Sequence, residues 1–231
     1  MPGIENELNK MVFTDVRTRP TYWTGICSAG VFSNSPFSIV HAGRGPLIFG
    51  LAQSPTTTPL PSPTENLMAT QLLDADILEA TLVSPDKLMQ ARLKKLVVNS
   101  IINPLTAVFN CKNGELLGGR VVGSDTIDRL VHEAGVIIKT LPVFQMDEHL
   151  RDIFSDENLR GWVNEVARAT AENTSSMLQD VRAGRKTEID FINGYLVQQA
   201  LETGKPCEQH KALIEKIKQL TPGGPASPNG A

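Results

Sequence analysis

Residues 95–103 read KLVVNSIIN, and this stretch indicates more than any other how the chain folds. Lys95, Asn99 and Asn103 recur every four residues within a run that is otherwise mostly apolar. Residues at this spacing lie on one face of an α-helix. The sequence therefore predicts a helix that is buried on most sides and has one polar stripe.

The polar stripe has two interpretations that spacing alone leaves open. Buried cations and carboxamides are costly unless they have partners. Either the stripe lines a crevice and binds a small polar ligand, or its groups cap neighbouring helices and reach solvent.

Composition describes an ordinary globular protein. The 231 residues suffice for one large domain or two small ones, with 41% hydrophobic and 20% charged residues. The net charge of −3 gives no basic footprint for nucleic acid, and 5% aromatic content gives little for base stacking. We expect no nucleic-acid partner.

The potential metal and disulfide residues are scattered along the chain: Cys27, Cys111, Cys207, His41, His132, His149 and His210. This spacing predicts neither a metal site nor a disulfide framework, and Cys111 has no adjacent base that would make it a nucleophile. No apolar run approaches the roughly 20 residues of a membrane span. The expected location is the cytoplasm, with no membrane partner.

The first third of the chain is predicted to be mainly β-structure. The expected elements are a helix over 4–13, strands over 23–32, 37–41 and 47–51, a Pro/Ser/Thr-rich loop over 53–64, a helix over 66–75 and a strand over 77–83. Gly43 and Gly45 form a GxG between two expected strands, which indicates a hairpin turn. A dinucleotide-binding loop needs GxGxxG between a strand and a helix.

The chain beyond Ser84 is predicted to be helical. We expect helices that begin at Ser84 and end at Pro104, begin at Ser124, begin at Asp156, run from Thr187 to near Gly204, and span 211–220. The Pro/Gly-rich tail over 222–231 is expected to be disordered. The predicted fold class is thus α/β plus all-α, with a boundary near Ser84.

A second candidate site lies around Glu188. Thr187 and Asp190 resemble a capping box, which would place Glu188 in the first helical turn. Its carboxylate either accepts hydrogen bonds from a ligand or only complements the helix dipole. Asn113, in an Asn-Gly turn pair, is by itself interpreted as structural.

Two longer runs resemble the ketopantoate reductase (2-dehydropantoate 2-reductase) family. They are KLVVNSIINPLTAVFNCKNGELL over 95–117 and ENTSSMLQDVRAGRKTEIDFINGYLV over 172–197. The resemblance covers Gly3 to about Leu220. It implies a truncated Rossmann-type NADP-binding half over 1–84, then a helical substrate-binding domain over 85–221. That domain would resemble the C-terminal domain of 6-phosphogluconate dehydrogenase.

The resemblance implies NADPH-dependent reduction of ketopantoate to pantoate, a step toward pantothenate and coenzyme A. Lys95 would be the catalytic lysine, which protonates the ketone oxygen. The residues implied to bind substrate are Asn99, Asn103, Asn113, Ser176, Met177, Leu178 and Gln179. Glu188 and Val31 would contact NADPH. The expected partners are a small 2-oxo acid and a second copy of the chain in a homodimer.

One family feature is missing from the sequence. Family members open with a strand, a GxGxxG loop and a helix that bind the NADPH pyrophosphate. This sequence starts with Met1-Pro2-Gly3, where the family has an Asn-Gly-Met-Gly turn. The chain is then a fragment of a complete reductase, or a shortened non-catalytic homologue that acts as a helical interaction module. Reduction of another 2-oxo acid is a third alternative, and an upstream targeting peptide would leave a mitochondrial location open.

Overall fold

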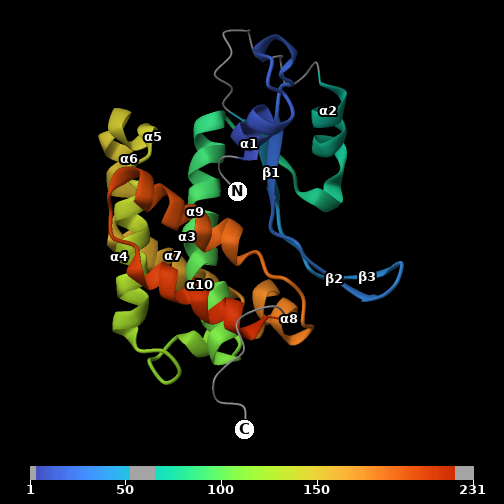
Figure 1. Cartoon of the computed structure of the whole chain (residues 1–231). Helices are drawn as coiled ribbons and strands as arrows, with labels where there is room; N and C mark the ends of the chain where they lie inside the picture. The colour runs from blue at the N-terminus through green and yellow to red at the C-terminus, as the bar shows by residue number, and fades with distance from the viewer. Residues whose placement is uncertain (1–3, 53–65, 222–231) are drawn as a thin grey trace. The chain divides into compact units, whose positions relative to one another are not determined.

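The computed structural model describes residues 4–52 and 66–221 (Figure 1). The chain divides into two compact units, residues 1–93 and 94–231, and the division falls within the long helix α3 (Pro85–Phe109). The expected loop over 53–64 and tail over 222–231 lie outside the described residues.

The first unit contains a three-stranded sheet and a separate hairpin. The order of strands in the sheet is β1 (Trp23–Cys27), β4 (Leu47–Leu51), β5 (Thr81–Leu82). The central strand β4 is antiparallel to β1, with Trp23 opposite Leu51, and parallel to β5. Strands β2 (Gly30–Ser35) and β3 (Ser38–Gly43) pair with each other in the hairpin.

The structure corrects three expectations in this unit. Residues 23–32 form parts of two strands, because the chain leaves the sheet after Cys27 and enters the hairpin at Gly30. Residues 42–46 are no hairpin turn, since β3 pairs with β2 while β4 pairs with β1. Gly45 instead allows a close approach: a Cβ there would lie 2.5 Å from the Ser28 carbonyl. The expected strand over 77–83 is only β5, preceded by a 3₁₀ turn, η3 (Asp76–Leu78).

Helix α1 (Ile4–Met11) packs by its polar face. The predicted helix is present, but Ile4, Leu8 and Met11 are 53%, 36% and 79% exposed. Glu5 and Asn9 are buried instead. Glu5 lies 2.7 Å from Arg92 Nη1, and Asn9 Oδ1 accepts a hydrogen bond from the Tyr22 hydroxyl. The expected helix over 66–75 is α2 (Leu67–Asp74), capped by Asn66.

The second unit is helical. After the second part of α3 it contains η4 (Asn113–Leu116), α4 (Ser124–Ile138), α5 (Pro142–Met146), α6 (Glu148–Ile153), α7 (Asp156–Ala169), α8 (Ser176–Arg182), α9 (Ile189–Thr203) and α10 (Glu208–Leu220). Helix α4 packs against α7, α9 and α10. In the described residues, no helix is both long and apolar enough to cross a membrane.

Helix α3 continues through Pro104 to Phe109, so the expected end at Pro104 is wrong. Proline has no N–H to donate to the carbonyl four residues earlier, which here belongs to Ser100. The side chain of Asn193, from α9, donates a hydrogen bond of 2.9 Å to that carbonyl instead. A distant side chain therefore supplies the donor that the proline removes.

The helix starts agree only partly with the sequence prediction. Helix α7 begins at Asp156 and α9 ends at Gly204, as expected; Ser155 is the N-cap of α7, and Gly204 lies in the left-handed region. The capping box at Thr187 and Asp190 is wrong, since α9 begins at Ile189 and its N-cap, Glu188, makes no side-chain cap hydrogen bond. Helix α4 begins at Ser124, as expected, but its N-cap residue is Gly123 and not Ser124.

Candidate functional site

The polar stripe lies on the part of α3 that belongs to the second unit. Lys95 is exposed, Asn99 is partly exposed, and Asn103 is 9% exposed. Among residues 96–107, all of which the structure describes, Asn99 is the only one that is not buried. The stripe is therefore the side of this helical segment that a polar ligand could contact.

A short 3₁₀ helix, η4, follows α3 and holds Asn113. The backbone N–H of Asn113 donates to the Asn173 carbonyl at 3.1 Å, and the side-chain Nδ2 of Asn113 donates to Thr170 Oγ1 at 2.8 Å. Asn113 is 7% exposed, and its Oδ1 is buried without a hydrogen-bond partner in the described residues. Such an acceptor is costly unless something satisfies it, and because Oδ1 has almost no accessible surface, a ligand hydroxyl reaches it only if the side chain moves.

Helix α8 is tied to α3 by two buried hydroxyls. Ser175 Oγ accepts a hydrogen bond from the Leu178 N–H and lies 2.7 Å from Thr106 Oγ1, which also bonds the carbonyls at 102 and 103. Thr106 lies one helical turn beyond Asn103. This link fixes the start of α8, and with it Ser176, close to the buried end of the stripe.

The four predicted residues on α8 differ in accessibility. Ser176 and Gln179 are exposed, and the Gln179 amide donates to the Thr174 carbonyl. Met177 and Leu178 are 2% and 1% exposed, so their side chains belong to the hydrophobic core. A ligand could contact these two positions only through the backbone.

An exposed ion pair joins η4 to the segment before α8. Lys112 Nζ lies 2.6 Å from Glu172 Oε2. This contact raises the pKa of Lys112 and lowers the pKa of Glu172, in each case mainly through the hydrogen bond between them. Because both side chains are well exposed, we assign the pair a small role in stability.

Neither of the two predicted cofactor residues belongs to this hydrogen-bonded set. Glu188 is exposed, and no hydrogen bond in the described residues joins it to α3, η4 or α8. Val31 belongs to the first unit, in β2, and is 54% exposed. Hydrogen bonds therefore connect elements that bear predicted substrate residues, whereas the predicted cofactor residues lie outside that network.

The cysteines offer no reactive thiol at this site. Burial raises the pKa of Cys111, and burial followed by the Glu133 charge raises the pKa of Cys207 to about 12. A thiol with a raised pKa stays protonated and is a poor nucleophile. Within residues 4–52 and 66–221, no cluster of His, Cys, Asp and Glu could hold a metal ion.

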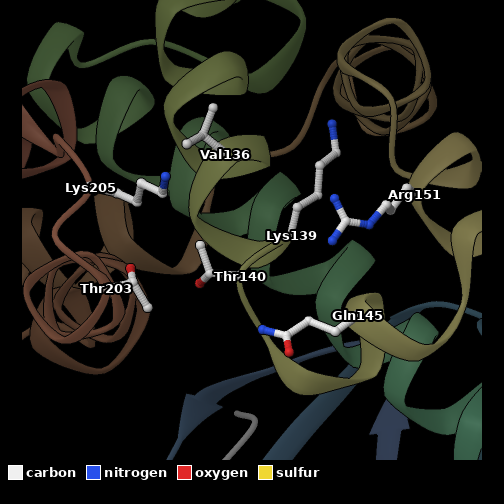
Figure 2. Close-up of a pocket in the computed structure, with 7 residues that line it drawn as sticks. All are labelled: Val136, Lys139, Thr140, Gln145, Arg151, Thr203 and Lys205. Carbon is white, nitrogen blue, oxygen red and sulfur yellow. The ribbon is translucent and has the colours of Figure 1, made fainter.

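The structure also contains an open pocket of about 610 Å³ in the second unit (Figure 2). Its lining residues are Val136, Lys139, Thr140, Gln145, Arg151, Thr203 and Lys205. None of these is a predicted site residue. The sequence gives no signal for this pocket, because its residues come from four separate segments with no common motif.

The helical unit is similar to a known family. Residues 87–221 match the family model described as the C-terminal part of ketopantoate reductase PanE/ApbA. The chain is 41% identical over 148 residues to the 2-dehydropantoate 2-reductase of Shigella flexneri, covering 63% of this chain and 45% of that protein. The chain spans about half the length of the curated relatives it matches.

Two further similarities extend over more of the chain. A ketoisovalerate reductase of Gibberella fujikuroi is 30% identical over 233 residues, covering 87% of this chain and 51% of that protein. A solved structure of a probable 2-dehydropantoate 2-reductase from Bacillus subtilis is 26% identical with a TM-score of 0.61, covering 92% of this chain and 65% of that one. This likeness includes the α/β unit, so the α/β plus all-α fold class is confirmed.

Proposed function

This chain belongs to the ketopantoate reductase family, and we propose that it provides substrate binding and proton donation for the NADPH-dependent reduction of ketopantoate to pantoate. The observation that carries the proposal is the polar stripe on α3. It lies inside the matched region, on a helix segment that is otherwise buried.

Lys95 is the residue to which we assign proton transfer. Reduction of a ketone places negative charge on its oxygen as hydride reaches the carbon. An ammonium group beside that oxygen donates the proton and stabilises the developing charge. Lys95 is suited to this role because it is the exposed end of the stripe.

Carboxamides are suited to hold the rest of the substrate. Asn99 and Asn103 each offer an N–H₂ donor and a carbonyl acceptor, and Asn113 offers its unpaired Oδ1. Ketopantoate has a carboxylate, a ketone and a hydroxyl, which need donors at two positions and an acceptor at the third. We assign Ser176 and the exposed Gln179 to the carboxylate end.

The residues that would contact the cofactor are Glu188 and Val31. NADPH supplies the hydride when it is bound. Among the described residues, no GxGxxG turn joins a strand to a helix to hold its pyrophosphate: Gly43 ends β3, and Gly45 lies in the link from β3 to β4. The described residues therefore provide contacts for only part of the NADPH molecule. Preference for NADPH over NADH, and formation of a homodimer, stay predictions from the resemblance.

Reduction of a different 2-oxo acid is the second candidate function. The similarity to a ketoisovalerate reductase favours this candidate, because the name of that protein indicates a 2-oxo acid substrate of related shape. Ketoisovalerate lacks the hydroxyl of ketopantoate. A site built to hydrogen-bond that hydroxyl rejects the analogue without it, because the site's polar groups then stay unpaired.

The test is NADPH oxidation by the chain with each of the two acids in turn. We expect kcat/KM for ketopantoate to exceed that for ketoisovalerate by at least about ten-fold. A preference for ketoisovalerate would support the second candidate. Binding of ketopantoate without turnover of either acid would contradict catalysis by this chain and support the alternative of a non-catalytic interaction module.

A further inference from the structure

The open pocket of the second unit has a strongly cationic lining. Lys139, Arg151 and Lys205 contribute positive charge, and no carboxylate is among the residues that line it (Figure 2). In Figure 2, the Lys139 and Arg151 side chains lie near each other on one side of α4, and Lys205 lies on the other side. The chain as a whole has a net charge of −3, so this concentration of cations runs against its average.

The hydrogen-bonding groups available in the pocket are mainly donors. The exceptions are the Thr140 and Thr203 hydroxyls, which already donate their protons to the carbonyls of Ile137 and Gln199 and offer only an acceptor. Arg151 Nε donates to the Phe144 carbonyl, but its two Nη groups make no hydrogen bond within the described part of the chain. The Lys205 ammonium and the Gln145 amide likewise have no partner among the described residues.

Helix capping does not account for these cations. Lys139 and Lys205 follow the ends of α4 and α9, where a positive charge could complement the helix dipole. Several of the terminal carbonyls already accept backbone hydrogen bonds, however, and neither ammonium group bonds to a terminal carbonyl within the described residues. These backbone bonds run from Lys139 N to Gly135 O, Leu141 N to Ile138 O, Gly204 N to Leu201 O and Lys205 N to Ala200 O.

Lys139 is only partly neutralised. Its Nζ lies 3.5 Å from Asp156 Oδ1, while the other oxygen of that carboxylate lies 2.7 Å from His132 Nδ1. One carboxylate outside the lining thus faces two basic groups, and the pocket keeps an excess of positive charge. An excess of this kind attracts anions.

We propose that this pocket binds a small polyanion, a metabolite with two or more phosphate or carboxylate groups. Arginine and lysine are the residues that bind such groups best, through charge-assisted hydrogen bonds. The volume of about 610 Å³ lies within the range of small-molecule sites and leaves room for an organic part beside the anionic groups. No residue of the proposed substrate site lines the pocket, so this inference does not depend on the reductase activity.

The test is a calorimetric titration of the full chain with inorganic pyrophosphate and, separately, with citrate, at physiological ionic strength. We expect saturable binding of at least one of them, with Kd below about 1 mM. The double variant Lys139→Ala, Arg151→Ala should weaken binding at least about ten-fold. Lys205→Ala should weaken it by a smaller factor. Preference for pyrophosphate over citrate would identify phosphate as the recognised group, and the reverse would identify carboxylate.

A matched control removes the same two charges elsewhere in the second unit. Arg168→Ala, Lys216→Ala changes an exposed arginine and an exposed lysine that do not line the pocket. This control should bind as the unmodified chain does. Equal weakening in control and pocket variants, or absence of saturable binding to the unmodified chain, would overturn the proposal. Thermal unfolding of each variant checks that it is folded.

Discussion

Replacing Lys95 by alanine is expected to lower kcat for ketopantoate reduction by a factor of about 10²–10⁴, the usual contribution of a positioned general acid. KM should change much less, because the lost interaction is strongest when charge has developed on the ketone oxygen. Steady-state NADPH oxidation at several ketopantoate concentrations separates the two constants. Lys95→Arg should also lose activity, since a guanidinium gives up its proton poorly.

Lys94 offers a matched control for this experiment. It is the neighbouring lysine, but its ammonium lies 4.8 Å from the Trp162 ring centre and 3.8 Å from Glu165. Lys94→Ala should keep kcat within about three-fold of the unmodified chain, because removal of such a surface contact has a small effect. If Lys95→Ala keeps most of kcat, or if both variants lose it equally, the assigned role of Lys95 is wrong.

The free energy of unfolding is expected to fall by about 3 kcal/mol between pH 6.5 and pH 4 through His210 alone. This side chain is 0% exposed, and burial lowers its pKa from 6.5 to about 4. Its Nδ1 accepts a hydrogen bond from Asn193, and its Nε2 donates to the Leu130 carbonyl, which suits the neutral ring.

The direction follows from proton uptake. The unfolded chain binds a proton at His210 as the pH falls through about 6.5, whereas the folded chain does not until about pH 4. The stabilisation is therefore complete above pH 6.5 and is lost on acidification through this window. The nearby Glu133, which accepts the backbone N–H groups of Gln209 and His210, opposes the shift but is outweighed by burial.

Urea unfolding at a series of pH values measures this effect. His210→Gln keeps one donor and one acceptor but cannot ionise, so its stability should depend less steeply on pH in this window. The control is His149→Gln, which changes an exposed histidine and should keep the original slope. If His210→Gln shows the same pH dependence as the unmodified chain, ionisation of His210 does not contribute.

The sequence predicted the fold best where periodicity and caps agree. The polar stripe of α3, the start of α7 at Asp156 and the end of α9 at Gly204 are recognisable from local residues alone. Pro104 was misleading for a physical reason. The donor that replaces its missing N–H comes from Asn193, 93 positions from the Ser100 carbonyl that it bonds. No local pattern contains that information.

Helix α1 shows a second limit of periodicity. The spacing of Ile4, Leu8 and Met11 identifies a helix but not the side that packs. The Glu5–Arg92 and Asn9–Tyr22 contacts turn the polar side inward. The strand pairing failed for a related reason, because the sequence of 42–46 cannot show that β4 pairs with β1 instead of β3.

The candidate site was predictable only in part. The spacing shows that Lys95, Asn99 and Asn103 share a face, and the structure adds which of them solvent can reach. Sequence reasoning alone interpreted Asn113 as structural, and only the structure shows that its Oδ1 has no partner among the described residues. The side chains of Met177 and Leu178 are buried, which the sequence pattern did not indicate. The cationic pocket joins residues from 136 to 205, so nothing short of a structure could reveal it.

The most direct test of the central claim is whether ketopantoate contacts the stripe. Side-chain amide signals of the chain can be followed by NMR during titration with ketopantoate in the presence of NADPH. We predict saturable shifts for the carboxamides of Asn99 and Asn103, none for the buried Asn193, and at least about ten-fold weaker binding in Asn103→Ala. Saturable binding that leaves the Asn99 and Asn103 signals unmoved would contradict the claim.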